Sequence, residues 1–233
     1  MNPTIRNWAR HTLAPGLMLV FFVGTGWVAD EQSEIAKRLV ASANVLDEVM
    51  ATPDKAIPDG VIKRAKCVAV FPHTVQVAVL VGAKHGKGFA TCRTTNGWSS
   101  PAPLTVAGGS WGAQLGGQEI DLVMVVTSDK GMQQLLSGKT NLGTETSVTA
   151  GPTGGHEWKM NEDVLTYARA RGVFAGFNLA GSSISQDQDD TRSLYGNSLS
   201  LNDILGGKSQ VPNAGQTFLD TVEKYAGQTR AKD

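Results

Sequence analysis

The 233-residue sequence lacks an excess of charge of either sign, because 21 lysines and arginines are matched by 21 aspartates and glutamates. A balanced chain has no overall electrostatic attraction for nucleic acid or for acidic membranes. We therefore expect no nucleic-acid partner, and binding to any other polyanion requires a local basic patch.

The sequence is also poor in residues that bind metals. Its two cysteines and four histidines are scattered and do not have the spacing of a zinc site. Residues 187–190 have the acid spacing of a calcium loop, but Arg192 stands where such a loop requires glycine. We interpret them as a solvated acidic turn and predict neither a metal nor any other cofactor.

The two cysteines, Cys67 and Cys92, both lie in apolar segments typical of strands. In an oxidising compartment an even pair favours a disulfide. A free cysteine also serves as a small core residue. The sequence alone leaves both possibilities open.

One motif suggests an enzyme. Residues 108–112 satisfy the pattern G-x-S-x-G with Ser110 at its centre. That pattern is catalytic where a strained strand-to-helix turn exposes the serine. Here Gly116, Gly117 and a further strand-like segment follow in place of the helix, and nothing marks His156 as the base. We predict no catalytic residue and a protein that is not an enzyme.

The first 29 residues are typical of a secretory signal peptide. Arg6 and Arg10 precede an apolar segment at residues 13–23, and small residues follow it. A membrane anchor is the alternative, but the segment is shorter than the roughly 20 apolar residues of a span and contains Pro15. We expect an exported chain, periplasmic or secreted and able to associate with a membrane.

Removal of the signal leaves one domain, residues 30–233, which is long enough for a sizeable core. The signal takes with it two arginines and no acid, so 19 cations then face 21 acids.

Apolar residues at helical spacing predict amphipathic helices at residues 33–50 and 213–226. Short helices are expected at residues 58–65 and 128–136. Between them, β-branched and apolar runs predict strands at 68–71, 75–81, 88–93, 104–107 and 120–127, with turns at 72–74 and 84–86 and a hairpin over 164–181.

The predicted fold class is α+β, with a glycine-rich antiparallel sheet or barrel-like core and amphipathic helices at both ends. The glycines permit bulges and close backbone approach in a curved sheet. The apolar face of helix 33–50 either packs on the domain or lies on a membrane surface, and periodicity does not separate these alternatives.

Several longer stretches occur together in one order along the chain. They read GWSSPA at 97–102, GGSWGAQLGGQ at 108–118, LLSGK at 135–139, AGP at 150–152 and YARARGVFAG at 167–176. With the later Tyr195-Gly196 and residues 203–205, they closely resemble the SYLF domain family over about residues 34 to 226.

The resemblance implies a lipid-binding module without established catalysis. Eukaryotic members bind phosphoinositides and, in fungi, actin, usually beside a second domain, whereas exported stand-alone versions are typical of bacteria. Their membrane binding uses an amphipathic helix that corresponds to residues 33–50 here. The resemblance therefore marks Ile35, Leu39 and Leu46 as candidates for facing a membrane.

Headgroup-binding residues are expected among cations near glycine-rich turns, where backbone amides and a side-chain charge meet a phosphate. Three clusters fit this description: Lys63, Arg64 and Lys66; Lys84, His85 and Lys87; and Arg169 with Arg171. Solvation of hairpin ends is the alternative role for each of these residues.

Together these observations predict an exported, non-enzymatic protein. It is expected to recognise anionic, phosphoinositide-like phospholipid membranes through a local basic patch and the first helix. A structural or protein-interaction module of the cell envelope, with a protein partner, is the alternative.

Overall fold

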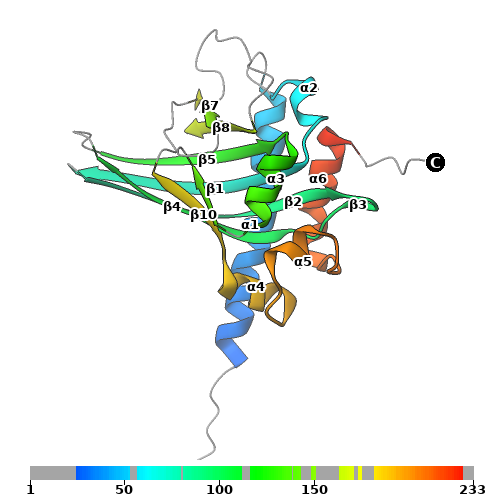
Figure 1. Cartoon of the computed structure of the whole chain (residues 1–233). Coiled ribbons are helices and arrows are strands. Elements are labelled where there is room, and N and C mark those ends of the chain that lie inside the picture. Colours follow the sequence, from blue (N-terminus) through cyan, green and yellow to red (C-terminus); the bar gives the residue numbers. More distant parts are fainter. Residues whose placement is uncertain are drawn as a thin grey trace, which may run out of the picture.

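The computed structural model describes residues 25–52, 57–79, 81–111, 116–137, 139–142, 148–150, 163–170, 173–174 and 181–227. In this part of the chain a large β-sheet is packed between helices (Figure 1). Residues 1–24 of the predicted signal peptide (residues 1–29) and the candidate Arg171 lie outside the described residues, whereas residues 25–29 belong to the first helix. Within them, no helix is long and apolar enough to cross a membrane.

Ten strands form the sheet: β1 (Cys67–Val79), β2 (Val81–Thr94), β3 (Gly97–Trp98), β4 (Ala102–Trp111), β5 (Gly116–Val126), β6 (Lys139–Leu142), β7 (Val148–Ala150), β8 (Val164–Ala170), β9 (Val173–Phe174) and β10 (Ser182–Gln186). Their order is β6-β10-β4-β2-β1-β5-β8-β7, with β3 beside β2 and β9 beside β8. The path is antiparallel from β6 to β8, and β7 pairs with β8 in parallel.

The sheet is curved but open. Seven chain steps, from Phe174 to Gly181, reach at most about 25 Å. Six inter-strand spacings separate β9 from β10, which in a flat sheet is about 29 Å. The sheet must therefore bend, as the glycine content predicted. Among the described strands, β6 and β7 lie at the two ends of the strand order and do not pair with each other. The barrel-like core is therefore not a closed barrel.

Helices cover both faces of the sheet. They are α1 (Thr25–Ala51), α2 (Asp59–Ile62), α3 (Asp129–Leu136), α4 (Gln188–Tyr195), α5 (Leu201–Leu205) and α6 (Gln216–Ala226), the last preceded by the 3₁₀ turn η1 (Asn213–Gly215). The amphipathic helices predicted near both ends of the domain are thus present, and Ser128 caps α3 by accepting from the amide of Gly131 at 3.0 Å.

Alternation along the strands divides the core in two, because successive strand side chains point to opposite faces. In β1, Cys67, Ala69 and Phe71 join a cluster with α3 and α5. Val68 and Val70 join a second cluster with α1, α2 and α6. The molecule thus has three layers, with α1 and α6 side by side behind the sheet in Figure 1.

The turn predicted at residues 72–74 is a bulge within β1. The register between β1 and β5 shifts by one residue between Phe71 and Thr74, and His73 there has a φ of 53°. The turn predicted at 84–86 is also wrong, because these residues lie inside β2, where His85 pairs with Ala107 of β4 and with Val75 of β1.

Candidate functional site

The three predicted cation clusters lie in different surroundings. The first cluster to consider consists of Lys84, His85 and Lys87. As neighbours on β2, Lys84 and His85 face opposite sides of the sheet. Lys84 is only 3% exposed, whereas His85 is exposed. Burial lowers the pKa of Lys84 from its usual value. These residues therefore form no common binding surface.

Lys87 is held by two acids of the α4 start. Its Nζ lies 2.7 Å from Asp187 Oδ2 and 2.9 Å from Asp190 Oδ1. Arg38 of α1 donates to the other oxygen of Asp190. Burial alone would lower the pKa of Lys87, but its bonds to both carboxylates raise it above its usual value. These charges join α1, β2 and α4 and are not available to a ligand.

Residues 187–190 are therefore not the solvated turn that the sequence predicted. Asp187 caps α4 by accepting from the amide of Asp190 at 3.0 Å, and it also accepts from the hydroxyl of Thr105 at 3.1 Å. Burial would raise the pKa of Asp187, but these bonds and Lys87 hold it below its usual value.

Arg169 on β8 is likewise occupied. Its guanidinium pairs with Glu48 of α1 and, at 3.0 Å, with Asp121 of β5. Desolvation would lower the pKa of Arg169, but the two carboxylates raise it. Arg169 therefore fixes the C-terminal half of α1 to the sheet.

The membrane-facing assignment of the α1 apolar face is contradicted by packing. Ile35 is 1% exposed, and Leu39 and Leu46 are fully buried in the cluster shared with α6 and the sheet. Exposing three such side chains costs roughly 5–9 kcal/mol, comparable with the whole stability of a typical domain. The face that periodicity identified is a core face.

The remaining cluster does gather at the surface. Lys63 and Arg64 are exposed after α2, and Lys66 precedes β1. We name these residues, with Arg93 at the end of β2, the basic corner. The side chains of Lys63 and Asp59 form an ion pair at 2.7 Å, and Lys66 pairs with Asp129. Two of these four cations thus pair with surface carboxylates of the described residues.

Arg93 organises this corner, and the sequence analysis missed it. Its Nε donates to the main-chain oxygen of Ala65 at 2.7 Å, and its Nη groups donate to the oxygens of Lys63 and Gly227. The guanidinium also lies 4.6 Å from the ring centroid of Trp98. Desolvation lowers its pKa. Only its position, directly after Cys92, could have marked it.

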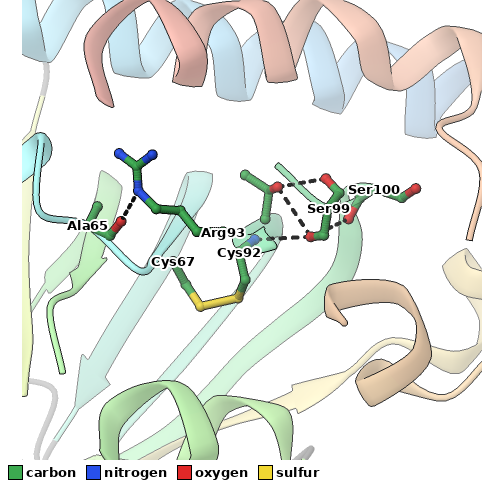
Figure 2. Close-up of a disulfide and its surroundings, with 7 residues drawn as sticks. Ala65, Cys67, Cys92, Arg93, Ser99 and Ser100 are labelled. Carbon is green, nitrogen blue, oxygen red and sulfur yellow. Dashed lines mark hydrogen bonds between the residues drawn. A yellow bond between two sulfur atoms is a disulfide. The ribbon is translucent and has the colours of Figure 1, made fainter. Parts of the chain in front are cut away.

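A disulfide lies directly beneath the corner. Cys67 and Cys92 face each other across β1 and β2 and are joined by an S–S bond (Figure 2). Arg93 points to the opposite side, toward Ala65 (Figure 2). The open question of the cysteines is answered in favour of the disulfide, which fixes the two strand ends that carry Lys66 and Arg93.

The corner's ion pairs are weak and exchangeable. Asp59 and Asp129 have side chains 76% and 80% exposed, and that of Lys63 is 63% exposed. Exposed pairs of this kind contribute about 0–1 kcal/mol each. A phosphate that offers more oxygens and more charge can therefore replace these carboxylates.

Other chemistry finds no support in the described residues. No group of three or more His, Cys, Asp or Glu residues there could hold a metal ion. Ser110 lies inside β4, two residues after Gly108, and not at a strand-to-helix turn.

Comparison with known proteins places these observations in a family. Residues 107–225 match the family model described as "Ysc84: Las17-binding protein actin regulator". SH3 domain-containing YSC84-like protein 1 of Bos taurus is 30% identical over 180 residues, which is 74% of this chain and 52% of the relative.

Two proteins of Saccharomyces cerevisiae are also similar. Protein YSC84 is 30% identical over 182 residues, 74% of this chain and 39% of its own length. LAS seventeen-binding protein 3 is 28% identical over 204 residues, 84% of this chain and 44% of its own length. The chain spans about half the length of the curated relatives it matches. The resemblance seen in the sequence is thereby confirmed: the chain belongs to the Ysc84, or SYLF, family.

Proposed function

We propose that this chain is an exported, non-enzymatic protein that binds anionic phospholipid headgroups through the basic corner. The observation that carries the proposal is the contrast between this corner and the other two predicted cation clusters. Lys87 pairs with two shielded carboxylates, and Arg169 pairs with the shielded Asp121 as well as with Glu48, whereas Lys63 and Lys66 pair with exposed carboxylates.

The corner suits a phosphate by charge and by rigidity. It gathers four cations, two of which pair with exposed carboxylates of the described residues, and Arg93 donates to main-chain oxygens. Each basic residue near an anionic membrane surface contributes about 1 kcal/mol, an attraction that salt screens. The disulfide and the Arg93 bonds hold the backbone of the corner in place, so little ordering is needed on binding.

Co-sedimentation with vesicles tests this proposal. Vesicles of phosphatidylcholine with 20–30% phosphatidylserine or phosphoinositide should bring down the protein at low salt, and phosphatidylcholine alone should bring down far less. Raising the salt toward 0.5 M should weaken the difference. Equal binding to neutral and anionic vesicles at low salt would contradict a headgroup site at the corner.

A protein-interaction module is the second candidate, because relatives are named for binding Las17 and the family model is described as an actin regulator. A polar surface cavity of about 430 Å³ could receive such a partner. It is lined by α4 and α5 residues and the segment after them, including Tyr195, Asn197, Gln210 and Val211. This function predicts capture of a protein partner that persists at high salt and without lipid.

A further inference from the structure

One end of the sheet projects beyond the helices (Figure 1). There β1 and β4 end and β2 and β5 begin. Val81 pairs with Trp111 and Ala78 with Gly116, so these four strand ends lie together. We name residues 75–79, 81–83, 109–111 and 116–117 the sheet tip.

The sheet tip exposes apolar side chains on the face that α1 covers elsewhere. Val75 is 44% exposed and Val77 is 50% exposed, two of the four large apolar side chains exposed in the described part of the chain. In register with Val77 lie Ala83 on β2 and Gly117 on β5, both exposed. The small neighbours leave Val77 standing on a flat face, whereas Val75 pairs with His85 and Glu119 at the inner edge of the tip.

The tip is also free of charge. No Asp, Glu, Lys, Arg or His occurs between residues 75 and 83, or between residues 107 and 118. The tip contains the polar residues Gln76 and Ser110 but no ionisable one. Ionisable groups begin at His73, Lys84, His85 and Glu119, where the same strands continue toward the helices. The uncharged stretch from Val75 to Val79 is about 13 Å long at 3.3 Å per residue. This is longer than the roughly 5–10 Å to which interfacial amphipathic helices enter the headgroup and acyl boundary, so the stretch is sufficient for the same depth.

The size of the exposed face argues against a protein partner. The thirteen residues of the tip lie on four strands and, at about 3.3 Å per residue and 4.8 Å between strands, present roughly 200 Å². A stable protein interface takes about 800 Å² from each partner. A bilayer requires no such area, since it accepts a few apolar side chains and excludes charged ones.

We propose that the sheet tip inserts into the interfacial layer of a lipid bilayer. The basic corner lies at the other end of β1, about eleven residues or 35 Å away. The layer formed by α1 and α6 lies over the sheet face between the two surfaces, so they do not reach one flat bilayer together. The chain therefore holds two bilayers together, one through each surface. Insertion of the sheet tip does not depend on the proposed headgroup site. The bridging of two bilayers does rest on that proposed site.

Vesicle clustering and co-sedimentation, measured on the same samples, test this inference. We compare the wild type with V75Q/V77Q and with the control V40Q, since Val40 is 43% exposed on the outer side of α1. The tip variant should still sediment with anionic vesicles at low salt but should no longer raise light scattering by clustering them. At high salt its residual binding should fall roughly ten- to hundredfold, as expected for two lost apolar anchors. V40Q should behave as the wild type.

A label gives a second readout. V77C, labelled with an environment-sensitive fluorophore, should shift its emission to the blue on addition of vesicles, while labelled V40C should not. The native cysteines are in a disulfide and do not react. Insertion of the sheet tip would be refuted if V75Q/V77Q clustered vesicles as well as the wild type does. It would also be refuted if the V77C label showed no shift on protein that sediments with vesicles. Analytical ultracentrifugation without lipid tests the alternative of a dimer. A dimeric wild type and a monomeric V75Q/V77Q would show that this face binds a second copy of the chain and not a bilayer. Loss of headgroup dependence with a shifted V77C label would refute the basic corner and leave the tip standing.

Discussion

Lys87 on β2 places its Nζ 2.7 Å from Asp187 Oδ2, at the residue that caps α4. One hundred residues separate the two along the chain. Together with Asp190 and Arg38 they tie the first helix, the central sheet and α4 into one unit. The sequence predicts Lys87, which is flanked by glycines, as a phosphate ligand. This bond explains why it is a structural residue instead.

Removal of Lys87 should destabilise the fold strongly. In Lys87→Met the carboxylates of Asp187 and Asp190, both under 10% exposed, would lose a shared cation. Breaking a shielded ion pair from one side costs about 3–5 kcal/mol, and Arg38 remains to limit the loss to the lower value. Urea unfolding should show this decrease, while the control Lys63→Met should change the free energy of unfolding by less than about 0.5 kcal/mol. Equal effects of the two variants would contradict the assignment.

Asp187 also makes the stability of the fold depend on pH. Because the pKa of Asp187 in the folded state is held below its usual value of 3.8, its contribution is present above about pH 4 and is lost as the pH falls through the folded pKa. In Lys87→Met burial dominates and the pKa of Asp187 rises, so acid unfolding should begin at a higher pH than in the wild type. Circular dichroism from pH 7 to pH 2 measures both midpoints. Identical midpoints would show that Asp187 does not govern acid unfolding.

The disulfide should contribute to stability through the chain that it closes. Cys67 and Cys92 are 25 residues apart, and a loop of this length corresponds to about 3 kcal/mol of lost unfolded-state entropy. C67A/C92A should remain folded, because the β1–β2 ladder continues from Val68 and Thr91 onward, but should unfold at lower urea. An unchanged midpoint, or free thiols detected by alkylation of the native protein, would count against the bond.

Gly88 should tolerate no side chain. A Cβ at this position would lie 2.1 Å from the main-chain oxygen of Val70 and 2.8 Å from Cα of Phe71. Gly88→Ala should therefore cost about 3 kcal/mol or prevent folding, in line with overpacked core positions. Gly117→Ala is the control, because the nearest atom to its Cβ is 3.8 Å away on Val77. Thermal melts that rank the two variants in the opposite order would refute the close approach.

The sequence identified helices and strands well where the pattern is local. The 3.6-residue period predicted α1 and α6, and the short helix expected at residues 128–136 is α3, although α1 begins earlier than predicted, at Thr25. Glycine was harder to interpret. The sequence predicts a turn at Gly86, but this residue lies in β2, and glycine is required there because a Cβ would meet Thr74 Oγ1 at 2.4 Å. A glycine permits both a turn and a close contact, and only the neighbouring strand decides between them.

The site was predictable only in part, because charge pairing is a long-range property. Lys63, Arg64 and Lys66 are adjacent in sequence and stay together at one corner. Lys87 and Arg169 pair with acids on elements distant in sequence, and Ile35 packs in the cluster shared with the sheet. An amphipathic helix looks the same in sequence whether its apolar face meets a core or a bilayer, and burial distinguishes the two cases.

The basic corner is tested most directly by charge reversal with a matched control. Lys63 and Lys208 are similarly exposed, at 63% and 67%, and each pairs with a single surface aspartate. In co-sedimentation with anionic vesicles at low salt, K63E/K66E should reduce binding roughly tenfold or more, whereas K208E should leave it near the wild-type level. Equal loss in both variants, or none in K63E/K66E, would contradict a headgroup site at the basic corner.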